Sequence, residues 1–274
     1  MFSVTLLKRS HVSLDSADRG AAPGSTRSAD ERSIRRGVRA VLLPGSGSDE
    51  RFVRNVFSAV LRAFGITPVT PVPRPGPGVV DGYRAALDAA AAEPGALLVG
   101  GISLGAHVAT AWAVRHRAEL GERLRGVLVA LPAWTGAADG APAALAARAT
   151  ASLVRVGGVE AALAEAAAGA PAWLAAELRR AWPRYGAGLA PALEAAAAEP
   201  APTASELARL DVPVGVAALT DDPVHPLPVA RTWYAALPRA ALDTETLAAF
   251  GADPGVVGRA AVLGWLRAGG NPAG

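Results

Sequence analysis

The sequence predicts an α/β protein with a mostly parallel central sheet, helices on both faces and an inserted run of alanine-rich helices. Short apolar runs alternate with helical stretches over residues 38–131 and again over 203–270. Parallel strands buried on both faces read as continuous apolar runs of this kind, and a helix joins each strand to the next. Between these two blocks, residues 132–202 contain helical patterns only.

The first block alternates strand and helix. Residues 38–43 (VRAVLL) are expected to form a buried strand that ends at Pro44-Gly45. A helix is predicted over 52–64, where apolar residues recur at spacings of one, three and four until Gly65 stops it. The prolines of ITPVTPVP place a short extended segment at an edge or in a loop. The rest of the block is read as a helix ending at Pro94, a buried strand at 96–100, a helix at 104–120 and a buried strand at 125–134.

Residues 132–202 are expected to form a helical lid inserted into the fold. Alanine-rich stretches follow one another there between Gly and Pro breaks, and alanine has the highest helix propensity. The alternation then resumes with a buried strand at 212–219, a helix at 228–237, a strand region at 239–250 and a last helix at 254–268. Residues 1–37 show no sustained apolar period and are predicted to be a disordered basic tail.

Composition and charge exclude several functions. The chain has 274 residues and a net charge of +3, but residues 1–38 hold seven basic and four acidic side chains, which leaves twenty of each in the rest. A neutral body lacks the positive surface that a phosphate backbone requires, so no nucleic-acid partner is expected. The absence of cysteine excludes disulfides and thiolate metal sites. We expect a cytoplasmic protein with no secretory signal and no membrane partner.

No cofactor and no metal are expected. The four histidines are scattered along the chain, and the carboxylates show no ligand spacing. The stretch GSGSDE lacks the third glycine and the downstream acid of a dinucleotide-binding fingerprint.

The motif Gly101-x-Ser103-x-Gly105 carries the functional prediction. It matches G-x-S-x-G, in which a serine on a sharp strand-to-helix turn holds its hydroxyl above the sheet. The flanking positions must be small because the strand and helix backbones crowd there. An apolar run precedes the motif and an uncharged helical pattern follows it, which is the setting the motif requires. The alternative is a glycine-rich turn without chemistry.

With this motif in place, residues 38–270 resemble the α/β-hydrolase superfamily of serine hydrolases and esterases. The resemblance implies an α/β-hydrolase fold with Ser103 as the nucleophile. It also implies an oxyanion hole formed by the backbone N–H groups of Ser46, in the loop LLPGSGSD, and of Leu104. The alternative for that loop is an ordinary turn capped by Ser48 or Asp49.

The same resemblance places the catalytic acid in VGVAALTDDPVHP. Asp222 falls on the acid position, and Asp221 is the neighbouring alternative. An Asp-Pro pair is also a common helix start, so a capping role is the other interpretation of this stretch.

The expected histidine base is missing from its usual place. The family carries it after the last strand, where this chain has Ala252 in the stretch GADP. His225, three residues after Asp222, is a candidate on reach alone, although a histidine there more often caps the turn or lines the entrance. The other histidines are expected to be packed in the core (His107), solvated at a helix end (His116) or in the tail (His11).

Three functional hypotheses stay open. The first is a serine hydrolase that acts on a small apolar ester or thioester through Ser103. The second, motivated by Ala252, is a catalytically impaired hydrolase-fold protein that binds a small apolar ligand. The third is an interaction protein whose alanine-rich helices form an oligomer surface. The oligomeric state itself is not predicted.

Overall fold

A computed structural model describes residues 37–273, in which six strands form one parallel sheet. The predicted tail therefore lies outside the described residues, except for Gly37. The strands are β1 (Arg39–Leu43), β2 (Thr67–Val69), β3 (Leu97–Ile102), β4 (Leu124–Ala130), β5 (Val214–Leu219) and β6 (Ala240–Glu245). Their order across the sheet is β2-β1-β3-β4-β5-β6, and every neighbouring pair is parallel. The predicted parallel sheet is confirmed.

The apolar runs of the sequence became the central strands. Every residue of β3 and β5 is buried, as the continuous apolar runs predict for strands covered on both faces. The proline-containing segment formed β2, a three-residue edge strand, and β6 forms the half-buried opposite edge. In register, Val99 of β3 lies beside Val41 of β1 and Val127 of β4.

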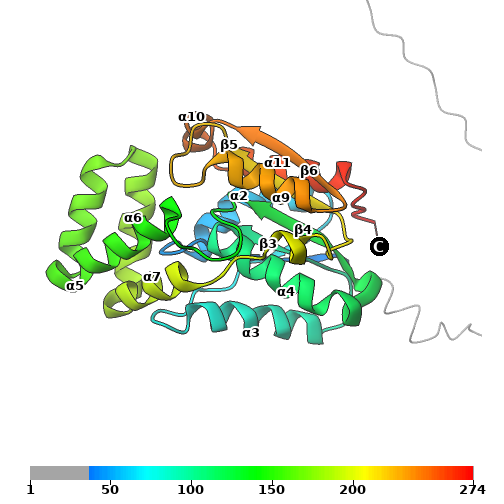
Figure 1. Ribbon diagram of the computed structural model, residues 1–274, viewed down its shortest axis with the longest axis horizontal. Helices are drawn as coiled ribbons and strands as arrows, with labels where there is room; N and C mark the ends of the chain where they lie inside the picture. The colour runs from blue at the N-terminus through cyan, green and yellow to red at the C-terminus, as the bar shows by residue number, and fades with distance from the viewer. Residues whose placement is uncertain (1–36, 274) are drawn as a thin grey trace, which may run out of the picture.

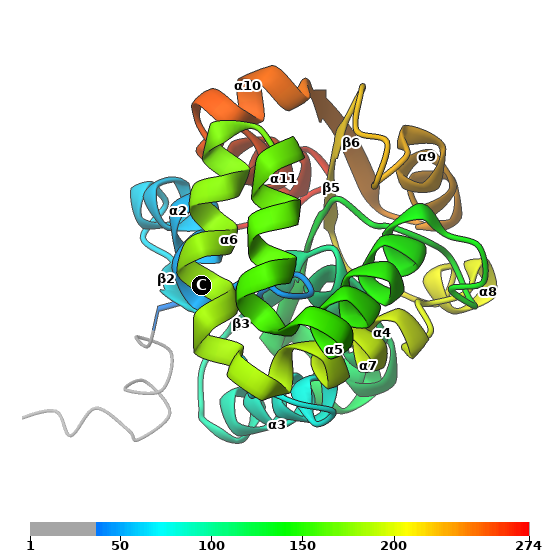
Figure 2. The same ribbon diagram turned by 90° about the vertical axis from the view of Figure 1, so that its left-hand side faces the viewer.

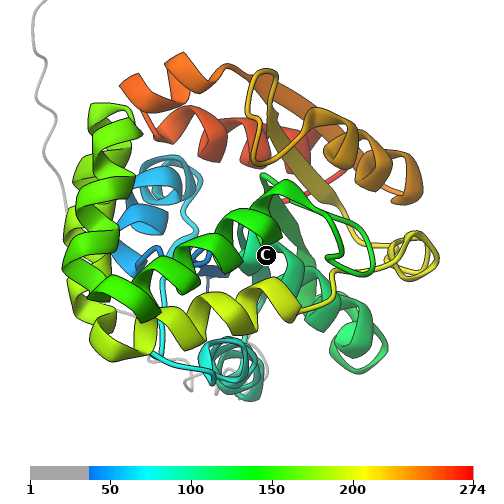
Figure 3. The same cartoon turned by 60° about the vertical axis from the view of Figure 1, so that its left-hand side comes forward.

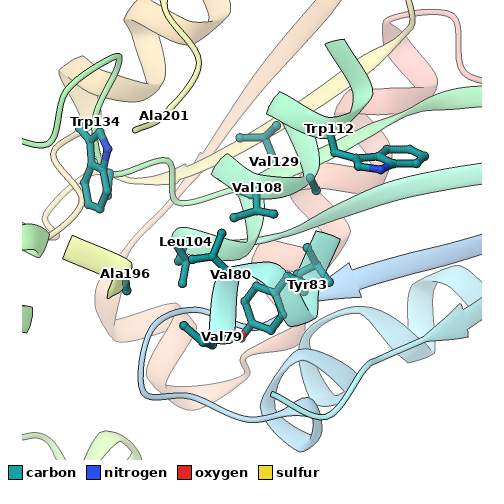
Figure 4. Packing of buried hydrophobic residues seen from close by; sticks show 14 of the residues in the cluster. Val79, Val80, Tyr83, Leu104, Val108, Trp112, Val129, Trp134, Ala196 and Ala201 are labelled. Carbon is teal, nitrogen blue, oxygen red and sulfur yellow. The ribbon is translucent and has the colours of Figure 1, made fainter. Parts of the chain in front are cut away.

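Helices cover both faces of the sheet, as Figures 1 and 3 show. One face packs against α3 (Val79–Ala92), α4 (Leu104–Leu120) and α9 (Leu227–Ala236), and the other against α2 (Glu50–Ala63) and α11 (Gly255–Arg267). Figure 4 shows part of the first core, where Tyr83 of α3 and Val108 of α4 pack near Val129 of β4. Alternate strand residues enter the two cores, which is the period-two pattern of a pleated strand.

Three further helices lie across one end of the sheet. They are α5 (Pro142–Gly169), α6 (Ala172–Tyr185) and α7 (Leu189–Ala198), and α5 packs against both of the others. In Figure 1 they stand together at the end where the strands point, and Figure 2 looks onto that end. The short helix α8 (Ala204–Leu207) leads back into β5.

Two expected elements differ from the structure. The strand region predicted at 239–250 ends at Glu245, and α10 (Leu247–Ala252) follows it, because the Thr246 hydroxyl accepts a hydrogen bond from Ala249 N and starts a helix. The long α5 contains a non-helical residue, Gly158 (φ 79°), at the glycine break that the sequence placed between two alanine-rich stretches. Only glycine adopts such a conformation without strain.

Candidate active site

Ser103 stands on a strained turn between β3 and α4. Its backbone has φ 53° and ψ −117°, a conformation that non-glycine residues rarely adopt. The flanking glycines are sterically required: a Cβ on Gly105 would lie 2.1 Å from the Leu43 carbonyl oxygen, and one on Gly101 would lie 2.4 Å from the same atom. The turn thus has the geometry that the G-x-S-x-G motif predicts.

The Ser103 hydroxyl meets an imidazole from the loop after β5. His225 Nε2 lies 3.0 Å from Ser103 Oγ, and His225 Nδ1 lies 2.8 Å from Asp222 Oδ2. With the Asp222 carboxylate accepting a hydrogen bond from Nδ1–H, Nε2 is unprotonated and can accept a hydrogen bond from the serine hydroxyl. Ser, His and Asp therefore form a continuous hydrogen-bonded relay, with the imidazole in the tautomer that a base requires.

A tight turn aims Asp222 at the imidazole. Asp222 Oδ1 accepts hydrogen bonds from the backbone N–H groups of Val224 (2.8 Å) and His225 (3.2 Å). Burial alone would raise the pKa of Asp222, but the contact with His225 and the two backbone donors outweigh it and hold that pKa below its usual value. The carboxylate stays ionised and locally anchored.

The neighbouring carboxylate, Asp221, contacts α10 instead of His225. Asp221 Oδ1 accepts a hydrogen bond from Leu247 N at 2.6 Å, at the first residue of α10. It lies outside the relay and satisfies a helix-terminal N–H group.

The other described histidines take no part in the relay. His107 is fully buried between Trp134 and Trp233, and its Nε2 accepts a hydrogen bond from Ala133 N at 2.9 Å. Burial, with a smaller contribution from the nearby His225, lowers the pKa of His107 to about 3. His116 lies at the far end of α4, where its ring stacks on Trp112. His11 is outside the described residues.

Ala252, where the family resemblance expects the base, lies at the exposed end of α10. It does not line the cavity above Ser103. The imidazole that contacts Ser103 thus comes from the loop after β5, and the loop after β6 supplies none.

The predicted oxyanion loop runs beside Ser103. A Cβ on Gly45 would lie 3.6 Å from Ser103 Cβ, so this loop and the serine are in direct proximity. Among residues 37–273, no acceptor is bonded to the backbone N–H of Ser46 or of Leu104. Asp49 ends the loop as the N-cap of α2, accepting hydrogen bonds from Arg51 N and Phe52 N, which is the capping alternative given for this loop.

A cavity of about 410 Å³ opens above Ser103, and its walls come from the loops and from α5, α6 and α7. An aromatic group forms one wall: Phe52 stacks on Trp173 at 6.4 Å, and Phe250 meets both rings edge-on at 5.9 and 5.3 Å. Alanine and leucine side chains of α5, α6 and α7 contribute further apolar surface. Glu177 is the one ionisable lining residue outside the Asp222–His225 pair in the described part of the chain.

Sequence reasoning missed a charged cluster that joins α6 to the start of α2. We call it the α6 clasp, and it consists of Ser48, Asp49 and Glu50 on one side and Glu177, Arg180, Arg184 and Tyr185 on the other. The only sequence signal was the spacing of the four α6 residues, which puts them on one helical face. Their partners lie about 130 positions away in the chain, where no local pattern points to them.

The residues of the described range include no group of three or more histidine, aspartate or glutamate side chains suited to a metal ion. None of the helices between residues 37 and 273 combines the length and apolar character that crossing a bilayer demands.

Comparison with known proteins identifies the fold. No protein-family model matches the sequence, and no curated protein matches it significantly. Solved structures do: a thermophilic esterase from Thermogutta terrifontis superposes with a TM-score of 0.64 at 20% identity, over 84% of this chain and 90% of the esterase. An α/β hydrolase from Sphaerobacter thermophilus gives a TM-score of 0.51 at 19% identity, over 81% and 92% of the two chains. The chain has the α/β-hydrolase fold.

The esterase RhEst1 from a Rhodococcus species shares this α/β-hydrolase fold, with a TM-score of 0.56 at 16% identity over 77% of this chain and 82% of that one. Identities this low carry the architecture and not the substrate. The chemistry of this α/β-hydrolase-fold protein must therefore be argued from its own site.

Proposed function

We propose that this protein is a serine hydrolase that cleaves carboxylic esters or thioesters with small apolar groups. The observation that carries the proposal is the relay from Ser103 Oγ through His225 to Asp222, with contacts of 3.0 and 2.8 Å. Its setting on a strained elbow, under an apolar cavity, supports the same reaction class.

In the proposed mechanism, Ser103 Oγ attacks the carbonyl carbon while its proton passes to His225 Nε2. The charge on the carbonyl oxygen is stabilised by the backbone N–H groups of Ser46 and Leu104, the latter at the N-terminus of α4. Asp222 stabilises the imidazolium, which then donates its proton to the leaving alcohol or thiol. Water repeats the sequence on the acyl-enzyme and releases the acid, so that Ser103 is regenerated.

The cavity supports a small apolar substrate. Phe52, Trp173 and Phe250 form an aromatic wall, and α5, α6 and α7 add alanine and leucine side chains. About 410 Å³ falls in the range of small-molecule sites and suits a short acyl or alkyl chain. In this proposal, α5, α6 and α7 act as the lid that keeps water from the acyl-enzyme.

The ligand-binding alternative depended on the missing histidine at Ala252. The contact of His225 with Ser103 removes that motive and favours the hydrolase. The oligomer alternative stays a prediction: α5 exposes the apolar side chains of Leu145, Leu153 and Val156.

The test combines active-site labelling with kinetics. A fluorophosphonate probe should label the wild type and not Ser103→Ala. His225→Gln should lower kcat/KM for p-nitrophenyl butyrate by about 10⁴- to 10⁶-fold, the usual cost of removing the base. His116→Gln, at the far end of α4, is the matched control and should keep wild-type rates. Equal hydrolysis by the wild type and His225→Gln, or labelling that does not require Ser103, would overturn the proposal.

A further inference from the structure

The loop that would hold the oxyanion has few restraints of its own. Within the stretch from Gly45 to Ser48, the described backbone makes one turn contact, from Ser48 N to Gly45 O at 3.2 Å. Gly47 has φ 68°, a conformation that glycine enters and leaves at little cost. The position of Ser46 N–H therefore depends on what holds the two ends of this stretch.

Helix α6 holds one end of the loop through two hydrogen bonds to one residue. The Tyr185 hydroxyl donates to the Ser48 carbonyl oxygen at 2.7 Å, and the Ser48 hydroxyl donates to Glu177 Oε1 at 3.0 Å. Glu177 and Tyr185 are eight residues apart and lie on the same face of α6. Both bonds are largely shielded from water, since Glu177 and Tyr185 are 5% and 6% exposed.

Ion pairs behind the loop tie the same helix to α2. Arg180 donates to both carboxylate oxygens of Asp49, at 3.1 and 3.0 Å, and also contacts Glu177. Arg184 bridges Asp49 and Glu50, at 3.0 Å to each. Because the Asp49 carboxylate is almost fully buried, water cannot replace these contacts without exposing it.

Burial also acts on Glu177 directly. It raises the pKa of Glu177 above its usual value, although Arg180 and Ser48 oppose the shift. The Glu177 carboxyl group lines the cavity, but its hydrogen bonds go to Ser48 and Arg180 of the clasp.

We propose that Glu177 and Tyr185 are positioning residues that set the catalytic geometry of the oxyanion loop by fixing Ser48. This inference rests on the function proposed above. Neither side chain would touch the reacting atoms; each acts through Ser48 on the N–H of Ser46, two residues earlier in the loop. The helices over the cavity would therefore contribute to turnover as well as to enclosure.

The expected effect follows from what a misplaced donor costs. Removing one oxyanion-hole donor lowers kcat by about 10²- to 10³-fold, and a loosened loop should lose part of that. We expect Tyr185→Phe and Glu177→Leu each to lower kcat by about 10- to 100-fold. For Tyr185→Phe, whose side chain does not line the cavity, KM should stay within about twofold. Glu177→Gln keeps an acceptor for the Ser48 hydroxyl and should recover part of the loss.

The discriminating readout compares two inhibitors. A trifluoromethyl ketone forms a tetrahedral oxyanion on the serine, whereas the matched secondary alcohol binds the cavity without one. In Tyr185→Phe, whose side chain does not line the cavity, the ketone should weaken by the same factor as kcat/KM, and the alcohol should not change. Glu194→Gln, which breaks the exposed Arg155–Glu194 pair between α5 and α7, is the control and should change neither.

The outcomes separate this inference from the proposed function. If the wild type shows no Ser103-dependent hydrolysis, the function fails. If it hydrolyses esters but Tyr185→Phe and Glu177→Leu keep the wild-type kcat and ketone affinity, the positioning role is wrong and the function stands. A parallel loss of ketone and alcohol binding in Tyr185→Phe would also overturn it, because that marks a general collapse of the cavity. Should Glu177→Leu not fold, Tyr185→Phe decides, since it removes a single oxygen atom.

Discussion

His107 should make the protein lose stability as the pH falls, because its surroundings in the core favour the neutral imidazole. In the folded protein His107 Nε2 accepts a hydrogen bond from Ala133 N, so a proton on Nε2 would set two donors against each other inside the core. Burial lowers the pKa of the folded His107 to about 3, whereas the unfolded residue has the ordinary value near 6.5. Between these values the unfolded state binds more protons, so stability falls with falling pH.

The magnitude follows from the pKa difference. At pH 4 the unfolded residue is protonated and the folded one is almost entirely neutral. Each unit of pKa difference corresponds to about 1.4 kcal/mol, so the free energy of unfolding should fall by about 3 kcal/mol between pH 7 and pH 4 on account of this residue. That loss is a large fraction of the stability of a typical domain.

The measurement is urea denaturation of the wild type and His107→Gln at pH 7, 6, 5 and 4. The Gln amide oxygen can still accept from Ala133 N but does not titrate. Folding lowers the pKa of some aspartates, such as Asp49 and Asp222, so their protonation in acid also lowers the stability of the protein. That contribution is the same in the wild type and in His107→Gln. The difference between the two proteins should therefore change by about 3 kcal/mol over this range. A difference that is independent of pH would refute the reasoning.

Three further outcomes are expected. Ala252→His should raise kcat/KM for p-nitrophenyl butyrate by less than twofold, because Ala252 lies outside the cavity; a large gain would mean that the wild type lacks a working base. Gly105→Ala should lower the melting temperature and abolish fluorophosphonate labelling, because the new Cβ would lie 2.1 Å from the Leu43 carbonyl oxygen. Such overpacking typically costs about 1–3 kcal/mol of stability. Normal labelling would contradict the crowding argument. Asp222→Asn should lower kcat by about 10⁴-fold, whereas Asp221→Ala should lose only about 1 kcal/mol of stability from the start of α10; the reverse ranking would assign the acid to Asp221.

The sheet and the elbow could be predicted because their determinants are local. The apolar runs that became β3 and β5 are continuous in the chain, and the two glycines that flank Ser103 are two positions away on either side. Crowding against the Leu43 carbonyl is what makes those glycines necessary, and their spacing records it in the sequence.

The contact between His225 and Ser103 was harder to predict. Spacing alone gave Asp222 and His225 a possible contact, but the backbone N–H bonds that turn the chain back on itself are not visible as a motif. The distance from His225 to Ser103 depends on how β5 lies relative to β3, with β4 between them. The sequence positions of the two residues do not predict this distance.

The α6 clasp was beyond local reasoning. Glu177, Arg180 and Arg184 resemble the solvated face of an alanine-rich helix, and surface charges of that spacing are common. Their partners follow β1, about 130 residues earlier. Only the placement of α6 beside the start of α2 turns this face into a part-buried network.

Asp222 and His225 lie in the same short loop after β5, and this has a mechanical consequence. A shift or tilt of β5 would carry Asp222 and His225 together and leave their 2.8 Å contact unchanged. The relay is vulnerable at its other joint, the 3.0 Å contact that crosses from one strand end to another. Substitutions that disturb the sheet should consequently separate the Ser103 hydroxyl from an imidazole that is still correctly oriented by Asp222. Neither β6 nor α10 contributes a side chain to these contacts, so changes there should leave them in place.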